Sequence, residues 1–420
     1  MNYKKEQIKE GITLHTIENE KFKTNLMAVF LTVPLKRQTV TLDTLLTLVL
    51  RRGCKKMPSQ EEISKTLEQM YGASFDGGIE KTGDNHILKF YLESLKEEFL
   101  PEKVELFKES INTLFEILFE PLVEKNAFKQ EYVEGEKQNL IQIINGKIDN
   151  KAFYALERCI EQMYQNEPYG LYKYGYIEDL ESITPETLYS YYQKFIQECK
   201  IDIFLSGTVK EELIKENEQI KQLRQRKAEY IINNEQTEEK QTKEIQTVEE
   251  KMDVAQGKLV LGLDVKDTSA RSKHVALVYN AILGGTPNSK MFQNVREKES
   301  LAYTASSGYV RQKNNIFIRC GIEVDNYSKA VELIKQQLTE MKQGDFTDDD
   351  LNNAKNFIIS TIKGIGDEQD TEISYYLGQE LAGSGLNPEL YANEIEKVTK
   401  EEVKQLADKV QINMIYFLRN

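Results

Sequence analysis

The stretch Leu42-Asp43-Thr44-Leu45-Leu46-Thr47-Leu48-Val49-Leu50-Arg51-Arg52-Gly53-Cys54-Lys55-Lys56 carries the strongest structural signal in the chain. Its apolar residues continue over about three helical turns, and two arginines followed by Gly53 end the run, as is typical of a helix C-terminus. On a 3.6-residue period, Thr44, Thr47 and Arg51 fall on one side, with Leu48 beside them. The stretch therefore predicts a mostly buried helix over residues 42–52 with a narrow polar stripe.

The whole chain has the composition of an ordinary globular protein. Its 420 residues, 40% hydrophobic and 29% charged, are enough for about two to four domains with substantial cores. The formal charge of -13 argues against a nucleic-acid partner, because such binding needs a basic surface that displaces counterions. No apolar run approaches the roughly 20 residues that span a bilayer, and no signal-peptide core follows Met1. We therefore expect a cytoplasmic protein with no membrane partner.

Cysteines and histidines are dispersed along the sequence. The four cysteines are Cys54, Cys159, Cys199 and Cys320. They lack C-x-x-C spacing, which is typical of reduced thiols. The three histidines, His15, His86 and His274, are isolated, and single histidines are more often surface or core residues than metal ligands. We expect no metal site in this chain.

Hydrophobic periodicity predicts an α+β layout for the first half. Strands are predicted at residues 12–17, 25–34 and 201–205, with a hairpin at residues 73–80 and 86–94. Helices are predicted at residues 42–52, 61–71, 101–119, 126–145, 151–165 and 185–198. This order indicates a sheet with helices packed on one face.

A charged segment and then a repeat of this order follow. Residues 210–252 predict a solvated helix and an interdomain linker, with at most a short strand at residues 230–232. Beyond it, strands are predicted at residues 258–265, 302–311, 315–323 and 414–418, and helices at residues 272–283 and 289–297 and from Tyr327, Asp348 and Ile373. The pattern predicts duplication of a whole domain, with boundaries at residues 1–209, 210–252 and 253–420.

The frame around residues 42–56 resembles the zinc peptidases of the pitrilysin/insulinase (M16) family, which carry an H-x-x-E-H motif on a helix that runs into a basic turn. Counted back from Gly53, the first His falls on Thr44, the Glu on Thr47 and the second His on Leu48. The chemistry needs two neutral imidazoles one turn apart to hold zinc, and a carboxylate to accept a proton from the metal-bound water. The resemblance therefore implies a degenerate motif without catalytic residues or metal ligands.

The family's third zinc ligand is also missing. In the family a Glu lies seven residues after a Glu-Lys/Arg pair. Matching Glu136 and Lys137 to that pair puts Ile143 at the ligand position. We interpret Glu131, Glu134 and Glu136 as a solvated helix face rather than a metal site. We therefore expect no cofactor in this chain, and zinc only in a partner subunit.

A Pro/Gly segment also resembles the family. Residues 166–170, Asn-Glu-Pro-Tyr-Gly, with Gly175 after them, are similar to a family turn. Because proline and glycine are the residues that turns require, we interpret this segment as a structural loop.

The best match to the family is the segment from Leu283 to Tyr303. There the family places an arginine and a tyrosine against the substrate backbone near the scissile carbonyl, and Arg296 and Tyr303 match them. A guanidinium can hold a carbonyl, and a phenol can donate to a developing oxyanion, so both are candidate substrate-binding residues. The alternative is an ion pair of Arg296 with Glu297 or Glu299 and a Tyr303 packed in its strand.

The resemblance implies a clam-like shell of two homologous halves, each a mainly antiparallel sheet with helices on one face, around a peptide chamber. Zinc-less subunits of this family, the YmfF-like group among them, pair with a subunit that carries H-x-x-E-H. We therefore predict a non-catalytic, substrate-binding or regulatory subunit of a heterodimeric zinc peptidase. Its partners would be that subunit and peptides or unfolded polypeptide, and it would act as a metallopeptidase only within the complex.

Other functions remain open at this stage. One is a structural or scaffold protein with the M16 fold and no role in proteolysis. Another is an accessory factor in elongation factor P modification, to which the YmfF-like group is linked by its family name. Catalysis with a different metal set built from the three histidines is the least favoured.

Overall fold

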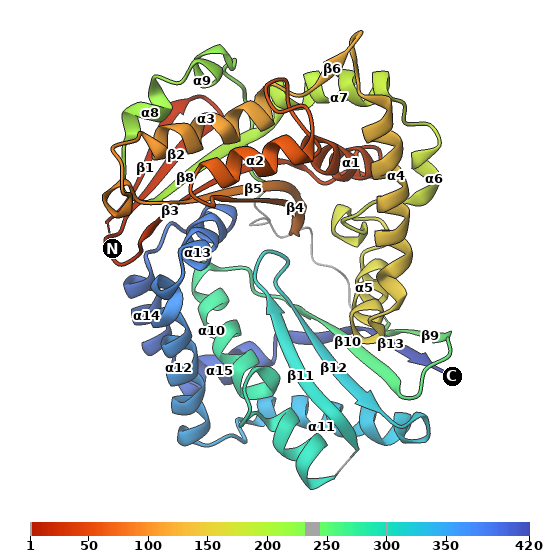
Figure 1. Ribbon diagram of the computed structural model, residues 1–420. Coiled ribbons are helices and arrows are strands. Elements are labelled where there is room, and N and C mark those ends of the chain that lie inside the picture. Colours follow the sequence, from red (N-terminus) through yellow and green to blue (C-terminus); the bar gives the residue numbers. More distant parts are fainter. Residues whose placement is uncertain (1, 232–243, 300) are drawn as a thin grey trace. The chain divides into compact units, whose positions relative to one another are not determined.

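The computed structural model describes residues 2–231, 244–299 and 301–420, which fall into two compact units. The first unit comprises residues 2–145 and 171–231. The second comprises Gly146–Gly170 and the described residues from 244 to 420. Each unit is built around its own sheet (Figure 1).

The first unit contains a six-stranded sheet of order β1-β2-β8-β3-β5-β4. Its strands are β1 (Asn2–Lys9), β2 (Ile12–Glu18), β3 (Thr24–Pro34), β4 (Ser74–Thr82), β5 (Asn85–Leu95) and β8 (Lys200–Gly207), with a separate small hairpin of β6 (Val123–Glu124) and β7 (Ala127–Phe128). Its helices are α1 (Val40–Leu50), α2 (Gln60–Gln69), α3 (Leu106–Phe119), α4 (Gln130–Asn145), α6 (Ile177–Leu180), α7 (Pro185–Glu198), α8 (Glu211–Lys215) and α9 (Glu218–Gln222).

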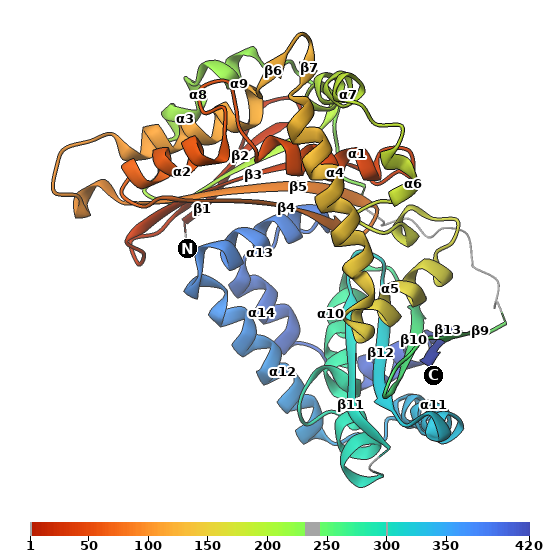
Figure 2. The ribbon, with the colours of Figure 1, turned by 45° about the vertical axis from the view of Figure 1, so that its right-hand side comes forward.

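One face of this sheet is apolar and is covered by helices that include α1, α3 and α7 (Figure 2). Because side chains alternate along a strand, residues such as Val29 on β3 and Ile203 on β8 point into the core. Leu45, Leu114 and Leu188 meet them from the three helices, and all five side chains are fully buried. Burial of this face holds the first unit together.

The second unit contains a five-stranded sheet of order β11-β12-β10-β13-β9. Its strands are β9 (Gln246–Lys251), β10 (Gly257–Val265), β11 (Ala302–Val310), β12 (Asn315–Ile322) and β13 (Val410–Arg419). Its α-helices are α5 (Lys151–Met163), α10 (Ala270–Asn280), α11 (Tyr327–Gln343), α12 (Asp348–Lys363), α13 (Gln369–Leu381), α14 (Pro388–Glu396) and α15 (Lys400–Ala407). Residues Ala281–Gly285 and Met291–Lys298 are π-helical.

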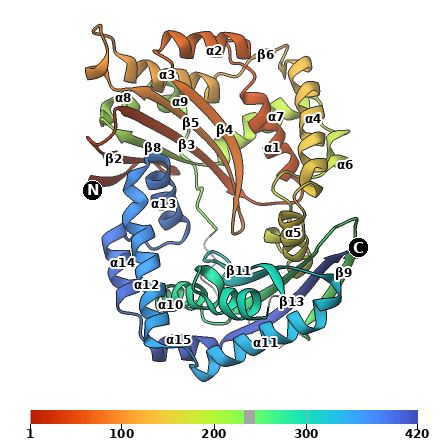
Figure 3. The same cartoon turned by 60° about the horizontal axis from the view of Figure 1, so that its bottom comes forward.

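The sheet of the second unit is covered on both faces. Leu261 on β10 and Ile318 on β12 pack with Ile334 of α11 and other helical residues on one face. On the opposite face lies α5, which packs against strand residues that include Tyr416 (Figure 3). Glu250 on β9 anchors α5, because its carboxylate accepts hydrogen bonds from Tyr154 Oη at 2.5 Å and from Arg158 Nε at 3.0 Å.

The two sheets have the same topology. The order β2-β8-β3-β5-β4 in the first unit corresponds to β9-β13-β10-β12-β11 in the second. In the first sheet β2 pairs with β8 in parallel, and in the second sheet β9 pairs with β13 in parallel. The other strand pairs in this correspondence are antiparallel. The predicted α+β class with two homologous halves is therefore confirmed. The predicted division of the chain into domains at residues 1–209 and 253–420, joined by a linker at residues 210–252, stays a prediction.

Several predicted elements differ from the structure at their ends. The helix expected from residue 101 begins at Leu106, where the Glu97 carboxylate accepts from the N–H of Phe107 at 3.3 Å. The helix expected from residue 126 begins at Gln130, since Asn126 takes a positive φ of 63° in the turn of the β6–β7 hairpin. The Glu97 carboxylate lies at the first boundary and the hairpin turn precedes the second, and periodicity alone locates neither.

The charged stretches contain more structure than the sequence predicts. Strand β1 pairs with β2, and β9 lies inside the expected linker, parallel to β13. Ile214 on α8 and Ile220 on α9 are buried in the core of the first unit, and Lys9 Nζ donates to the Ile220 carbonyl at 2.9 Å. Tyr230 and Ile231 lie outside any strand, and residue 232 lies outside the described residues. Backbone pairing and a few isoleucines stabilise segments whose composition is polar.

A buried polar cluster lies on the face of the first sheet opposite its helices. His15 Nε2 lies 2.9 Å from Asp202 Oδ1, and the same carboxylate accepts from Lys200 Nζ at 2.6 Å and from Tyr230 Oη at 2.5 Å. Both His15 and Asp202 are fully buried. Burial alone would raise the pKa of Asp202, but the hydrogen bond from His15 and the charge of Lys200 outweigh it and lower the pKa to about 2.

We expect Asp202→Asn to destabilise the protein by about 3 kcal/mol at pH 7, because it leaves buried partners without their counter-charge. The pKa of Asp202 is lower in the folded chain than its ordinary 3.8, so the carboxylate stabilises the fold above about pH 4. This contribution is lost as the pH falls through about 2. Urea unfolding across this pH range should show a flatter acid dependence in the variant.

The matched control is Asp76→Asn. Asp76 is 78% exposed and pairs with Arg51 at 3.0 Å, so its loss should change the free energy of unfolding by about 1 kcal/mol or less. Equal effects of the two substitutions would contradict the importance of the buried cluster.

Candidate functional site

Helix α1 carries the degenerate motif positions and turns them toward the protein interior. Thr44 and Thr47 are each 1% exposed, and Leu48 is half-buried against the core of the first unit. Thr47 Oγ1 donates to the backbone carbonyl of Asp43, one helical turn earlier, at 2.9 Å. We call Thr44, Thr47 and Leu48 the motif face of α1.

The backbone carbonyl of Lys173 lies against this motif face and accepts hydrogen bonds from two side chains. Thr44 Oγ1 is 3.0 Å from it and 3.1 Å from the Val40 carbonyl, so the hydroxyl shares one proton between two acceptors. His86 Nε2 is 2.9 Å from the same Lys173 oxygen. The other ring nitrogen, Nδ1, is 2.9 Å from Asp43 Oδ2, and both of these side chains are fully buried.

A third side chain completes this network. Tyr191 Oη donates to Asp43 Oδ1. Burial and the carboxylate of Asp43 raise the pKa of Tyr191, so the phenol keeps its proton and remains a donor. Sequence reasoning missed the network of Asp43, His86 and Tyr191, because its members lie far apart in the chain. The one signal available was the position of Asp43 beside Thr44.

The loop that supplies the Lys173 carbonyl is anchored to the start of α1. Thr41 Oγ1 donates to Asp179 Oδ2 at 2.5 Å and accepts from the N–H of Tyr176 at 3.0 Å. Arg37 Nη1 donates to the same Asp179 oxygen at 2.6 Å. Gly175 has a φ of +79°, and a Cβ there would lie 2.3 Å from Thr41 Oγ1. This close approach agrees with a structural role for the loop.

The position of the third family ligand also faces the core. Ile143 on α4 packs in part against the core of the first unit. Glu131 and Glu134 are exposed, as the solvated-face interpretation requires, but that interpretation is wrong for Glu136. Glu136 is 5% exposed, and its Oε1 accepts from Arg52 Nη1 at 3.2 Å, so it stabilises the contact between α4 and the end of α1.

These residues do not fit a zinc ion. Leu48 and Ile143 have no lone pair, and the hydroxyls of Thr44 and Thr47 donate to backbone carbonyls instead of facing a common point. Within residues 2–231, 244–299 and 301–420, no group of three or more His, Cys, Asp or Glu side chains is arranged to hold a metal ion. On the motif face, Thr44 is therefore taken up by the Lys173 carbonyl, Thr47 by its own helix and Leu48 by the core.

Arg296 lies in the π-helical segment of the second unit and is 43% exposed. Its Nε is 3.5 Å from Glu297 Oε1, and its guanidinium lies over the Phe292 ring, 4.5 Å from the ring centre. One of the two ion pairs considered from the sequence is thus present, whereas Glu299 pairs with Lys329 at 3.0 Å. The pair with Glu297 is on the surface and weak, so the guanidinium can exchange it for another acceptor.

Tyr303 lies near the start of β11, an edge strand of the second sheet. It is 63% exposed, so it is not packed as the alternative interpretation required. Its hydroxyl donates to Glu323 Oε1 at 3.0 Å, and this hydrogen bond and the charge of Glu323 raise the pKa of Tyr303. The phenol therefore stays protonated at neutral pH, and its one donor is engaged with the exposed Glu323 carboxylate, which it would leave to donate to another acceptor. A role of Arg296 and Tyr303 in substrate binding stays a prediction.

Comparison with known proteins identifies the family. A family model described as the peptidase M16 inactive domain matches residues 182–358. The probable inactive metalloprotease YmfF of Bacillus subtilis is 35% identical over 418 residues, which cover 97% of this chain and 96% of that protein. This chain belongs to the M16 peptidase family. It is an inactive M16 homologue, and its zinc motif positions have become part of the hydrogen-bonded interior.

Solved structures agree with this membership. A conserved protein from Enterococcus faecalis V583 aligns with a TM-score of 0.90 and 27% identity, over 100% of this chain and 99% of that one. A peptidase M16 inactive domain from Pseudomonas fluorescens aligns with a TM-score of 0.80 and 18% identity, over 100% and 98% of the two chains. Both units therefore belong to the M16 fold. In the described part of the chain, no helix has both the length and the apolarity that crossing a membrane requires.

We expect Gly175→Ala to lower the free energy of unfolding by more than about 2 kcal/mol. The substitution combines the strain of a positive φ with a collision against Thr41, which would push the loop away from α1. The matched control is Gly72→Ala, since Gly72 has a similar φ of +75° and nothing within 4 Å of its Cβ position. That control should cost only about 1–2 kcal/mol.

Urea denaturation of both variants measures the difference. Two-dimensional NMR of the histidines gives a second readout, because displacement of the loop removes the Lys173 acceptor from His86. If the two alanine variants had equal stability and an unchanged His86 signal, the close packing of the loop on α1 would not be important.

Proposed function

We propose that this chain is the non-catalytic, substrate-binding subunit of a two-chain zinc peptidase. The partner chain would carry an intact H-x-x-E-H motif and the zinc ion. This chain would contribute Arg296 and Tyr303, which would hold the backbone of a peptide or of an unfolded polypeptide. The partner would supply all metal chemistry.

The observation that carries the proposal is the contrast between the two halves of the chain. In the first half, Thr44 and Thr47 are buried and hydrogen-bonded to backbone carbonyls. In the second half, the segment that matches the family best leaves Arg296 and Tyr303 on the surface. An exposed phenolic donor and a weakly paired guanidinium are suited to the carbonyl groups of an extended peptide.

The test is reconstitution with an H-x-x-E-H-bearing M16 chain from the same organism. The isolated chain should not cleave a fluorogenic unfolded peptide, whereas the mixture should cleave it in a chelator-sensitive way. Size-exclusion chromatography of the mixture measures complex formation separately from activity. Cleavage by the isolated chain, or the lack of a complex at micromolar concentrations, would contradict the proposal.

The double variant Arg296→Ala, Tyr303→Phe should lower kcat/KM of the mixture by about 10- to 100-fold, since it removes two polar contacts with the substrate. Complex formation should be unchanged. The matched control is Arg419→Ala, Tyr71→Phe, because Arg419 also pairs with a surface glutamate and Tyr71 is also exposed.

The control should keep full activity. If the Arg296 and Tyr303 variant also bound and cleaved peptides like the wild type, these residues would have no role in substrate binding. If the complex formed and its kcat/KM were the same with the Arg296 and Tyr303 variant, the control variant and the wild type, a scaffold role for the chain would be favoured.

A further inference from the structure

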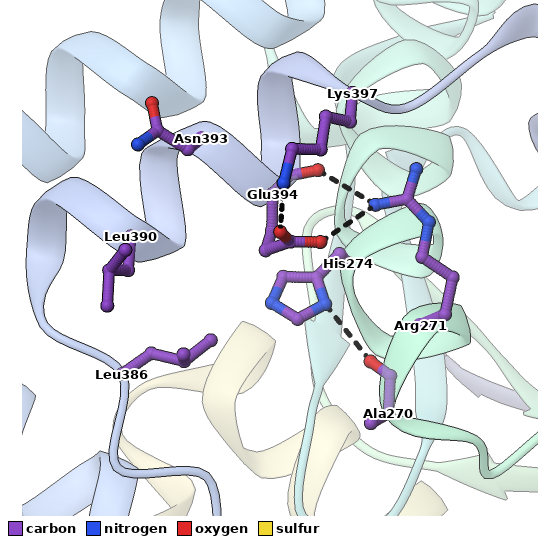
Figure 4. A pocket seen from close by; sticks show the side chains of 8 residues that line it. All are labelled: Ala270, Arg271, His274, Leu386, Leu390, Asn393, Glu394 and Lys397. Carbon is purple, nitrogen blue, oxygen red and sulfur yellow. Dashed lines mark hydrogen bonds and ion pairs between the residues drawn. The ribbon is translucent and has the colours of Figure 1, made fainter.

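A second candidate site lies in the second unit, at a cavity of about 330 Å³ between the start of α10 and helix α14 (Figure 4). The residues that line it are Ala270, Arg271, His274, Leu386, Leu390, Asn393, Glu394 and Lys397. Its volume is at the lower end of the roughly 300–1,000 Å³ of small-ligand sites. Neither the M16 membership nor the proposed peptidase function accounts for it.

The protonation state of His274 is determined by its surroundings. Its Nδ1 lies 3.0 Å from the backbone carbonyl of Ala270, which can only accept, so Nδ1 carries a proton. The side chain is 5% exposed. Burial and the charge of Arg311 lower the pKa of His274 below its ordinary 6.5, so the ring is neutral at physiological pH. The second nitrogen, Nε2, therefore holds a lone pair and acts as an acceptor.

This acceptor has no hydrogen-bond partner within the described part of the chain. Buried polar atoms are nearly always paired, so an unpaired one needs an explanation. Figure 4 shows Nε2 on the side of the ring that faces Leu386 and Leu390. Nε2 itself is closed to solvent, so a donor reaches it only when the apolar wall beside it moves, and Leu390, at 50% exposed, lies at the outer side of that wall.

The charged groups around the cavity are already paired with one another. Arg271 donates two hydrogen bonds to Glu402, at 2.8 and 2.9 Å, and one to the Glu394 carbonyl at 2.9 Å. Lys397 Nζ is 2.6 Å from the Glu394 carboxylate. Because these charges compensate each other, a charged ligand would have to break an existing pair. The cavity is suited to an uncharged, mainly apolar ligand with one hydrogen-bond donor.

We propose that this cavity binds a phenolic group, with its ring against Leu386 and Leu390 and its hydroxyl donating to His274 Nε2. A phenolic hydroxyl is more acidic than an aliphatic one and is therefore the stronger donor to a neutral imidazole. The Tyr391 ring packs against His274, with the two ring centres 4.8 Å apart, and helps to fix the imidazole in place. A free phenol and the tyrosine side chain of a peptide offer the same chemistry.

The test is titration of the full chain with p-cresol, followed by NMR of ¹³C-labelled histidine. The chain has only three histidines, so the His274 signal is identified by its loss in His274→Phe. We expect p-cresol to shift this signal and to leave those of His15 and His86 in place. Toluene has the same shape without the hydroxyl, and it should bind at least about fivefold more weakly.

One further ligand and two variants make the result specific. The tripeptide Gly-Tyr-Gly separates the two sources of the phenol, because only a site open to a chain can accept it. Leu390→Trp should fill the cavity and abolish the shift while keeping His274. Phe153→Trp is its control, since Phe153 is also exposed, lies on α5 and does not line the cavity.

A His274 shift with either p-cresol or the tripeptide, lost in Leu390→Trp and kept in Phe153→Trp, supports the proposal and assigns the source of the phenol. The proposal is overturned if neither ligand shifts the signal at millimolar concentration. It is also overturned if toluene and p-cresol bind equally, or if Leu390→Trp binds like the wild type. The Leu390 variant keeps the test decisive if His274→Phe does not fold.

Discussion

Buried polar groups must find hydrogen-bond partners, and this constraint determines the structure around α1. Asp43, Thr44 and Thr47 lie on a helix whose other residues, apart from Thr41, are apolar, and none of the three reaches solvent. Their partners are His86, Tyr191 and the carbonyls of the helix and of the 171–179 loop. An unpaired buried group costs roughly 1–3 kcal/mol, so the loop, the hairpin strand β5 and helix α7 are held in one arrangement. The motif face is thereby closed by the same contacts that stabilise the first unit.

Much of this fold could be predicted from the sequence because its signals are local. The apolar run of β3, the stop at the end of α1 and the cap of α2 at Ser59, which accepts from the N–H of Glu62, lie within a few residues of what they determine. The strands β1 and β9 could not be predicted, since their charged residues are held by backbone pairing with distant strands. The candidate site divides in the same way. The motif positions could be located by their spacing in the sequence. The network of Asp43 and His86 could not be predicted, because these two residues lie 43 positions apart on different elements.

The duplication gives the two halves one topology but separate cores, so each half can use its helices differently. Each sheet forms its own core, so a change on α1 does not alter the packing of the second unit. In the second unit the π-helical segment that carries Arg296 packs beside β11, and its side chain and that of Tyr303 stay at the surface. Exposed residues contribute little to stability, so their identity is free to serve binding. In the first half, in contrast, helix α1, which follows β3 as α10 follows β10, packs its motif positions into the first unit.

The packing around α1 opposes the restoration of a zinc site. Once Thr44 and His86 share the Lys173 carbonyl, an imidazole at position 44 would have to displace a loop anchored by Thr41 and Asp179. Position 143 would in addition need a carboxylate where the half-buried Ile143 now packs against the core, and partial burial of a charge without a partner is unfavourable. No single substitution restores the ligands without first weakening the fold. The inactive state of this M16 chain is therefore stabilised by its own core.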